Sequence, residues 1–371
     1  MARRFNITGP CVPQRDFMVD LTSRLRRPVQ AISRGESLLL VRARQSGKTT
    51  LLRELSQALR QQNLAVVLAA MQVAEDQTLG GLFRHIEATL QKAYPLPALP
   101  KWTPTEPHSL SFCAWLGEAQ QRLGRPLVLI LDEYDAPPRK LVLSMLRSFR
   151  SALALADDSR PFVHSLTLCG KTHVRDLRDE LRPSGDESRG TGSLWNIALP
   201  LPLPSLSQAE VEALLDEYTA ESGVPWRREA REELWHKTHG QPWLVSRICY
   251  ELDEQLGCPR LFAVPADGDK GAPANAVPPA VATVRAIAAQ LLEEDCVHLL
   301  SVSDLLLGRR DAQELVQRLL AEEEVVLCRT NEAQSYLLDT GILSPSESGR
   351  FIELHNPIYE SYLSRWLNEQ N

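Results

Sequence analysis

Two short groups of polar residues in this sequence could together bind and cleave a nucleotide. The first is Gly47-Lys48-Thr49, which ends the phosphate-loop pattern G-x-x-x-x-G-K-[ST]. In such a loop, backbone N–H groups surround the β-phosphate, the lysine reaches the β- and γ-phosphates, and the hydroxyl ligates Mg²⁺. We therefore expect ATP or ADP to bind here with Mg²⁺. The predicted nucleotide-binding residues of the loop are Arg44, Gln45, Ser46, Gly47, Lys48, Thr49 and Thr50.

The second group is Asp132-Glu133, directly after the apolar run from Val128 to Leu131. An aspartate at the carboxyl end of such a strand holds Mg²⁺, usually through water, and the next glutamate orients the attacking water. Each group has a plain alternative: a surface turn that happens to read GKT, and an acid pair that caps a helix. Both groups in the right context are hard to obtain by accident.

Arg42 departs from the phosphate-loop pattern, which has glycine at this position. The first loop glycine mainly eases the turn out of the strand, whereas the phosphate contacts come later in the loop. We therefore expect nucleotide binding to be kept. Hydrolysis does not follow from the loop alone, so a nucleotide-binding scaffold without turnover stays an alternative.

The first half of the chain alternates short apolar runs with helical patterns, which predicts an α/β fold with a parallel sheet covered on both faces. After Lys48, leucines at 51, 52, 55 and 59 form the stripe of a helix. Further helices are expected near 79–93 and 108–123. The predicted strands are 37–42, 63–71, 126–135, 161–170 and 195–203.

From residue 205 onward the pattern is mainly helical. Ser207 and Glu210 form a capping box at the start of an amphipathic helix. Proline, glycine, alanine and aspartate dominate residues 264–280, which predicts a flexible linker. Helices near 281–294, 301–307 and 311–321, followed by a β-ribbon, suggest a winged-helix module. The predicted domains are an ATPase core (1–204), a helical lid (205–263), the linker (264–280) and a winged-helix-like domain (281–371).

The composition is that of an ordinary soluble globular protein, with 371 residues, 43% hydrophobic and 24% charged. The net charge of −6 disfavours a protein whose main task is to grip nucleic acid, although a local basic face is compatible with it. The seven cysteines are scattered and never spaced C-x-x-C, which indicates reduced thiols. There is no secretory signal and no run of ~18 apolar residues, so we expect a cytoplasmic protein without a membrane span.

The segments "RQSGKTT", "LVLILDEYD", "GQPWLV" and "NPIY" carry a resemblance that extends over nearly the whole chain. They are similar to the bacterial AAA-like ATPase-domain family, close to the STAND-type and archaeal-type ATPases. The resemblance implies an ASCE-type P-loop core, a helical lid and a C-terminal winged helix. Members usually carry alanine or glycine where this chain has Arg42, so that position is already relaxed in the family.

The resemblance also implies roles for single residues. Gly240-Gln241-Pro242 matches the G-x-P turn of the lid, with Pro242 against the nucleotide. The alternative is a glycine-terminated helix followed by a proline in the first turn of the next helix. Thr167 or Lys171, at the end of the fourth strand, would contact the γ-phosphate. The alternative for these two is a solvated loop residue.

Three further assignments come from the same resemblance. The segment "FNITGPCV" near the N-terminus would lie along the adenine. Arg175, Arg178 and Arg182 could include an arginine finger, although a solvated charged face is the preferred interpretation. His355 matches a phosphate-contacting histidine by position alone, and a structural histidine is the preferred interpretation there.

The function that these residues predict is a nucleotide-dependent switch that hydrolyses ATP slowly. Its catalytic residues would be Lys48, Glu133 and either Thr167 or Lys171, with Thr49 and Asp132 on Mg²⁺. Its output would be contact with a separately encoded partner protein or effector, or assembly into a homo-oligomer. A winged-helix DNA-binding ATPase is the alternative, and the acidic character of residues 281–371 disfavours it.

Overall fold

The structure is a computed structural model that describes residues 3–73, 78–95, 101–103, 108–155, 162–174, 198–255, 278–294 and 296–370. The chain divides into two compact units. The sheet unit contains Leu21–Arg42 and Leu51–Leu203. The helical unit contains Met1–Asp20, Ala43–Thr50 and Pro204–Asn371, so the predicted phosphate loop groups with the helices.

The sheet unit is built on five parallel strands in the order β2-β3-β4-β1-β5. This confirms the predicted α/β class with a parallel sheet. The fifth strand is shorter than predicted, and residues 195–197 lie outside the described residues. The strands are β1 (Leu38–Val41), β2 (Ala65–Ala70), β3 (Leu127–Asp132), β4 (Ser165–Gly170) and β5 (Leu199–Pro200).

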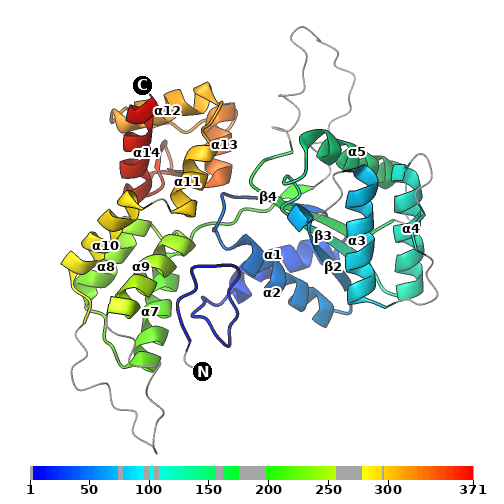
Figure 1. The fold of residues 1–371 in the computed structure, drawn as a ribbon, viewed down its shortest axis with the longest axis horizontal. Helices are drawn as coiled ribbons and strands as arrows, with labels where there is room; N and C mark the ends of the chain where they lie inside the picture. The colour runs from blue at the N-terminus through cyan, green and yellow to red at the C-terminus, as the bar shows by residue number, and fades with distance from the viewer. Residues whose placement is uncertain are drawn as a thin grey trace, which may run out of the picture. The chain divides into compact units, whose positions relative to one another are not determined.

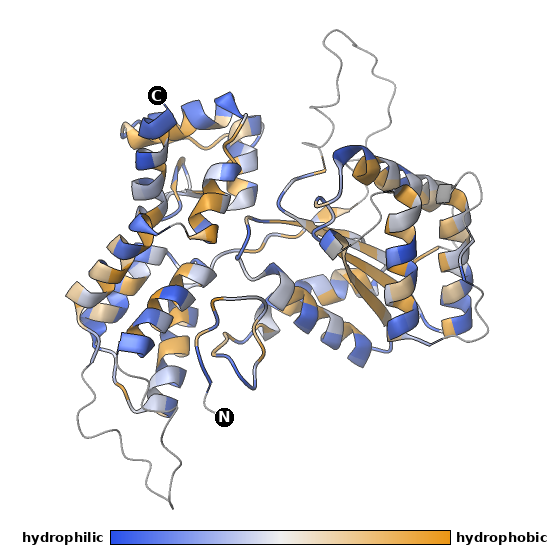
Figure 2. Cartoon of the chain, in the orientation of Figure 1, coloured by the Kyte–Doolittle hydropathy of each residue, from blue (hydrophilic) through white to orange (hydrophobic). Residues whose placement is uncertain are grey.

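Helices cover both faces of this sheet because the strands are apolar on both sides (Figures 1 and 2). Alternate residues of β1 point to opposite faces: Leu38 and Leu40 pack with α1 and α2, while Leu39 and Val41 pack on the other face. The four predicted leucines of α2 are all buried. The helices are α1 (Thr22–Ser33), α2 (Lys48–Gln61), α3 (Leu79–Ala93), α4 (His108–Leu123) and α5 (Arg139–Leu155).

The helical unit has one hydrophobic core, which also takes in Phe5 and Phe17 of the N-terminal segment. Its first helix begins with the predicted capping box, since Ser207 and Glu210 bond to each other's backbone N–H groups. The helices are α7 (Gln208–Ser222), α8 (Arg228–Thr238), α9 (Pro242–Gln255), α10 (Val281–Glu293), α11 (Val297–Asp304), α12 (Arg310–Leu320), α13 (Glu332–Thr340) and α14 (Pro357–Gln370).

A small antiparallel sheet of order β6-β8-β7 belongs to the same unit. It contains β6 (Val325–Val326), β7 (Leu343–Pro345) and β8 (Phe351–Leu354). Helix α11 begins at Val297, four residues before the predicted start at 301. Within the described ranges, no helix combines the length and the apolarity that a bilayer crossing needs.

The cysteines that the structure describes are all free thiols, as the scattered spacing predicts. Cys258 lies outside the described residues. Burial raises the pKa of the Cys113 thiol to about 12, so this side chain is an inert part of the core.

Candidate functional site

The phosphate loop connects β1 to α2 and turns through two residues with left-handed backbone. These are Gln45, with φ +57°, and Gly47, with φ +82°. Such a turn aims successive backbone N–H groups to one side, where they can bind an anion. Apart from the chain neighbours of Gly47, no heavy atom of the described residues lies within 4 Å of the position that a Cβ on Gly47 would take. The loop therefore leaves open space beside Gly47, directly before the N-terminus of α2, and helix N-termini are places where phosphate binds.

Arg42 fits the backbone without strain. Arg42 does not have a positive φ, and its N–H donates to the carbonyl of Gly170 at 3.1 Å. The residue thus continues the pairing of β1 with β4 for one more position. Glycine is not needed here, because the sharp turn of the loop occurs later, at Gln45 and Gly47.

Lys48 is buried, with 8% of its surface exposed, and folds back over the loop. Its ammonium donates to the carbonyl oxygen of Ala43 at 2.6 Å. The hydroxyl of Ser46 donates to the same oxygen at 2.8 Å. Two predicted nucleotide-binding side chains therefore converge on one carbonyl of the loop, which holds the ammonium at the loop.

The helical unit holds the phosphate loop from several sides. The N–H of Ala43 donates to the carbonyl of Thr340 at the end of α13, at 2.9 Å. Gln241, the residue before α9, donates from Nε2 to the carbonyl of Gln45 at 3.2 Å. Its Oε1 accepts the N–H of Leu244 at 2.6 Å, so the same amide caps α9 and binds the loop.

The Gly240-Gln241-Pro242 turn has a local structural reason for its first and last residues. Gly240 has φ +69°, and a Cβ there would stand 1.9 Å from the carbonyl oxygen of Leu206. Pro242 is the first residue of α9, a place where its missing N–H costs nothing. The residue of this turn that reaches the loop is Gln241. Contact of Pro242 with a nucleotide stays a prediction.

His298 is a buried residue of α11 that sequence reasoning missed. Its Nε2 lies 2.9 Å from the hydroxyl of Tyr359, and its ring stacks on Trp243. Burial lowers the pKa of His298 to about 3; the backbone of Arg44 opposes this shift and the positive charge of Lys48 adds to it. The ring is therefore neutral at neutral pH and close to the phosphate loop. No motif surrounds it, so nothing in the sequence marks it.

His355 is hydrogen-bonded within the helical unit, in keeping with the structural histidine that the sequence favours. Its Nε2 lies 2.8 Å from the hydroxyl of Ser205, and its carbonyl oxygen lies 2.7 Å from Nδ1 of His239. Both bonds join segments within the helical unit.

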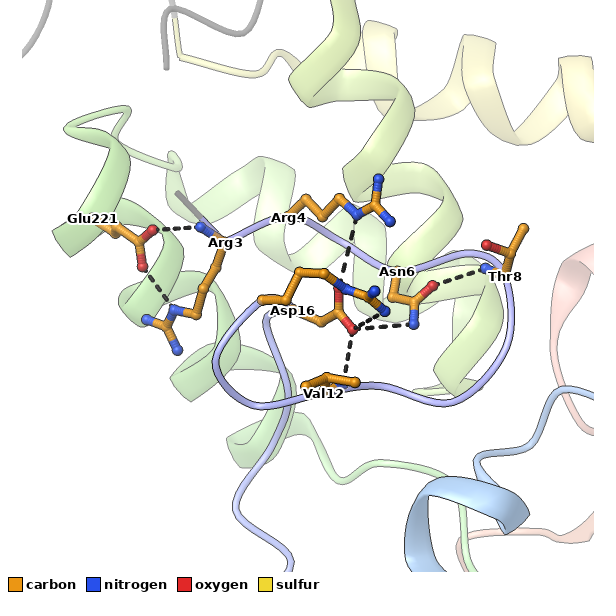
Figure 3. Close-up of polar contacts among 8 residues, drawn as sticks. Arg3, Arg4, Asn6, Thr8, Val12, Asp16 and Glu221 are labelled. Carbon is orange, nitrogen blue, oxygen red and sulfur yellow. Dashed lines mark hydrogen bonds and ion pairs between the residues drawn. The ribbon is translucent and has the colours of Figure 1, made fainter. Parts of the chain in front are cut away.

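A buried carboxylate, Asp16, organises the N-terminal segment (Figure 3). It is fully buried and accepts hydrogen bonds from Asn6 at 3.3 Å and from the N–H of Val12 at 2.8 Å. The guanidinium of Arg15 donates to the same carboxylate at 3.2 Å. Residues 6–16 thus form a closed loop around one charge, as buried carboxylates require.

This segment is attached both to the helices and to the phosphate loop. Arg3 pairs with Glu217 and Glu221 of α7 at 2.7 and 2.8 Å. The N–H of Cys11 donates to the hydroxyl of Thr50 at 3.1 Å, directly after the loop. The indole N–H of Trp243 donates to the carbonyl of Ile7 at 3.0 Å. The expectation that "FNITGPCV" lies along an adenine stays a prediction.

The acid pair lies at the carboxyl end of β3, in the interior of the sheet. Asp132 is the last residue of this strand and is 5% exposed. Its Oδ1 accepts the N–H of Glu133 at 3.0 Å. Glu133 has φ +52°, a left-handed conformation that is strained for a residue with a side chain. Strain of this kind concentrates at functional sites, which supports the predicted role of Glu133.

The next residues of this turn organise the end of β4. Asp135 accepts the N–H groups of Lys171 and Thr172 at 3.0 and 2.8 Å. A Cβ on Gly170 would stand 2.6 Å from Oδ1 of Asp135, so glycine permits the close approach. Asp135 therefore fixes the turn in which Lys171 lies.

The two predicted γ-phosphate contacts lie at different depths. Lys171 directly follows β4 and is exposed. Thr167 is fully buried in the middle of the strand, opposite Leu38 and Ile130. The expectation that Thr167 lies at the strand end is therefore wrong, because β4 continues for three more residues. Arg175, Arg178 and Arg182 lie outside the described residues.

The residues predicted to hold Mg²⁺ suit that ion by their chemistry. Thr49 offers a hydroxyl and Asp132 a carboxylate, and Mg²⁺ takes oxygen ligands. Within the described part of the chain, no group of three or more His, Cys, Asp or Glu side chains could hold a metal ion. An ion that arrives with a nucleotide keeps several waters and phosphate oxygens, so few protein ligands suffice.

A comparison with protein families adds to this geometry. Residues 31–177, which run from α1 past the end of β4, match the family model described as "AAA domain". The chain contains an AAA-type P-loop domain. The phosphate loop and the acid pair both lie within the matched residues of this AAA domain. Among curated proteins, no match to the sequence was found.

A solved structure shares this fold at low sequence identity. The Walker-type ATPase Paby2304 of Pyrococcus abyssi superposes with a TM-score of 0.62 at 12% identity, over 97% of this chain and 99% of that one. The ORC2 protein of Aeropyrum pernix reaches 0.48 at 13% identity, over 94% of both chains. The RuvB branch migration motor of Thermotoga maritima reaches 0.40 at 14% identity, over 90% and 92%. Only the first of these likenesses supports an argument about fold.

Proposed function

We propose that the protein is an ATP-dependent switch whose phosphate loop passes the nucleotide state to the helical unit. The observation that carries the proposal is the set of hydrogen bonds around residues 43–50. Three parts of the helical unit bond to them: the N-terminal segment at Cys11, the start of α9 at Gln241, and the end of α13 at Thr340. A change in the loop backbone therefore acts on all three parts.

The backbone of Ala43 connects Lys48 to α13 in this proposal. The N–H of Ala43 bonds to Thr340, and its carbonyl oxygen accepts the ammonium of Lys48. Phosphate oxygens are stronger acceptors for an ammonium than a carbonyl is. A bound nucleotide would draw Lys48 away from Ala43 and so alter the link to α13. The switch then depends on the difference in affinity between the two states.

Hydrolysis would use the residues at the end of β3. Mg²⁺, when bound with ATP, neutralises the charge of the phosphate oxygens. Thr49 and Asp132 would hold this ion. Glu133 would orient the attacking water and accept its proton. Its strained, left-handed backbone would fix the direction in which the side chain leaves the chain. We infer slow turnover, since the task of the switch is to hold a state.

We further propose that the output is contact with a separately encoded partner protein. The apolar side chains of Val297, Leu300 and Leu307 on and after α11 are 60%, 44% and 56% exposed, which favours a protein contact surface. Residues 322–324 are three consecutive exposed glutamates, which disfavours DNA at this part of the predicted winged helix. Assembly into a homo-oligomer is a second route to the same output.

Calorimetry with ATP and ADP in the presence of Mg²⁺, together with phosphate release, tests the proposal. Wild type should bind both nucleotides and release phosphate slowly. Glu133→Gln should keep the affinity for ATP and lose about 100-fold or more of the turnover, because a general base contributes that much. Glu54→Gln on α2 is the control and should behave as wild type. Binding without any turnover would leave a nucleotide-binding scaffold, and no binding would overturn the proposal.

A further inference from the structure

Positive charge is concentrated in one stretch of this acidic chain. Residues 22–61 contain nine lysines and arginines and two glutamates, a net charge of +7 in a chain of −6. The phosphate loop accounts for part of it. The rest is on α1 and α2, which cover the same face of the parallel sheet. The hydroxyl of Ser33, at the end of α1, donates to the side chain of Gln62, just past α2, at 2.7 Å.

Several arginines of these two helices differ from the arginines that are paired with carboxylates in the helical unit. In the helical unit, Arg3, Arg231 and Arg285 lie within 3 Å of carboxylates. On and next to α1 and α2, five exposed arginines have no ion-pair partner within the described ranges. They are Arg26, Arg27, Arg34, Arg53 and Arg60.

Two of these arginines line a cavity of about 520 Å³ beside β2, at the edge of the sheet. Its walls are the outer face of α2 and the side chain of Leu68. The guanidinium of Arg60 donates to the carbonyl of Val66 at 3.1 Å, which fixes it at this edge. The lining residues are Arg53, Ser56, Gln57, Arg60, Gln61 and Leu68.

We propose that this cavity is a contact site for the phosphate backbone of a nucleic acid. Arginine and glutamine are residue types that contact phosphate and sugar oxygens, and no carboxylate is among the described residues that line the cavity. Arg53 and Arg60 are seven residues apart on α2, roughly 10 Å along its axis, so they can hold two phosphates of one strand.

A nucleic acid fits this site better than an acidic protein segment does. Protein interfaces depend on buried apolar or aromatic anchors, and Leu68 is the one apolar side chain in the lining. Backbone contact with a nucleic acid needs only charge and hydrogen bonds. The contact would not depend on base sequence, since nothing in the lining is placed to read bases.

The test is fluorescence anisotropy of the full chain with a labelled single-stranded and a labelled duplex oligonucleotide over a range of salt. Wild type should bind with a Kd of roughly 10⁻⁶ to 10⁻⁴ M, as non-specific sites do. Arg53→Glu/Arg60→Glu should weaken binding at least about tenfold and lower the salt slope by about two, the loss expected for two phosphate contacts. The matched control is Arg228→Glu on α8, an exposed arginine that is paired with Glu232.

A second variant guards against a folding defect, because Arg60 also bonds to β2. Gln57→Glu/Gln61→Glu keeps both arginines and adds negative charge to the cavity, and it should also weaken binding. ATP affinity should stay at the wild-type value in both variants. The inference is overturned if wild type does not bind either oligonucleotide at low salt. It is equally overturned if Arg228→Glu loses as much affinity, or if both cavity variants bind as wild type does.

Discussion

The phosphate loop and the acid pair of the AAA domain are held in different ways. Asp132 ends a strand of six buried residues, and the ladders to β2 and β4 fix its position. The loop instead accepts hydrogen bonds from Gln241 and Cys11 and donates one to the carbonyl of Thr340. The acids therefore have a rigid frame, whereas the loop depends on segments that are remote in sequence. A nucleotide can change the loop with little cost to the frame.

The largest expected effect on nucleotide binding comes from removing the charge that links the loop to phosphate. Lys48→Ala should weaken ATP binding about 100-fold, since a charge-assisted hydrogen bond contributes about 3 kcal/mol. Calorimetry measures this loss, with Lys140→Ala on α5 as the control. Unchanged ATP affinity in Lys48→Ala would show that the loop is not the phosphate site.

A separate effect concerns pH and the stability of the helical unit alone. Folding lowers the pKa of His298 from 6.5 to about 3 by burial, so the unfolded chain takes up a proton before the folded chain does. The stability that the neutral ring provides is fully present above pH 6.5 and is lost as the pH falls toward 3. Over this whole range the loss is on the order of 5 kcal/mol.

Urea unfolding at pH 7 and pH 4 measures this difference in wild type and in two variants. His298→Phe keeps an aromatic ring beside Trp243 and should reduce the drop between the two pH values. The exposed His236→Phe should leave the drop as in wild type. An equal drop in all three proteins would show that His298 does not control the pH dependence of this unit.

The smallest effect separates the two roles of Gln241. Gln241→Ser keeps a cap for α9 but is too short to reach Gln45, whereas Gln241→Ala loses both bonds. Each variant should weaken ATP binding about fivefold, the effect of losing one hydrogen bond of ~1 kcal/mol. Only the alanine variant should unfold at a lower temperature. If the serine variant keeps wild-type affinity, the bond between Gln241 and the loop does not serve the nucleotide site.

The frame of the site could be predicted from the sequence because its signals are local. The run Val128 to Leu131 predicts a buried strand, and the residues that follow must then lie at its end. The leucine stripe after Lys48 predicts α2, and both are present in the structure. The predicted domain limits stay predictions, as does the binding role of each loop residue.

The surroundings of the loop could not be predicted, because they are contacts between segments far apart in the chain. His298 and Thr340 carry no motif, and their closeness to residues 43–44 exists only after folding. For Thr167, a local signal in the sequence gives the wrong position. The sequence predicts that Thr167 lies at the end of the fourth strand. In the structure β4 continues to Gly170, and Thr167 is buried within the strand.

The division of the chain into units also has a consequence for its synthesis. The helical unit needs both ends of the chain, because Arg3 pairs with α7 and Ala43 bonds to Thr340. The ribosome releases the sheet unit first, and at roughly 5–20 residues per second the remaining helices take roughly 10 to 30 seconds more. During this interval the sheet unit can fold, while the phosphate loop still lacks the partners that hold it. Nascent chains should therefore gain the loop's native geometry last, after α13 has emerged.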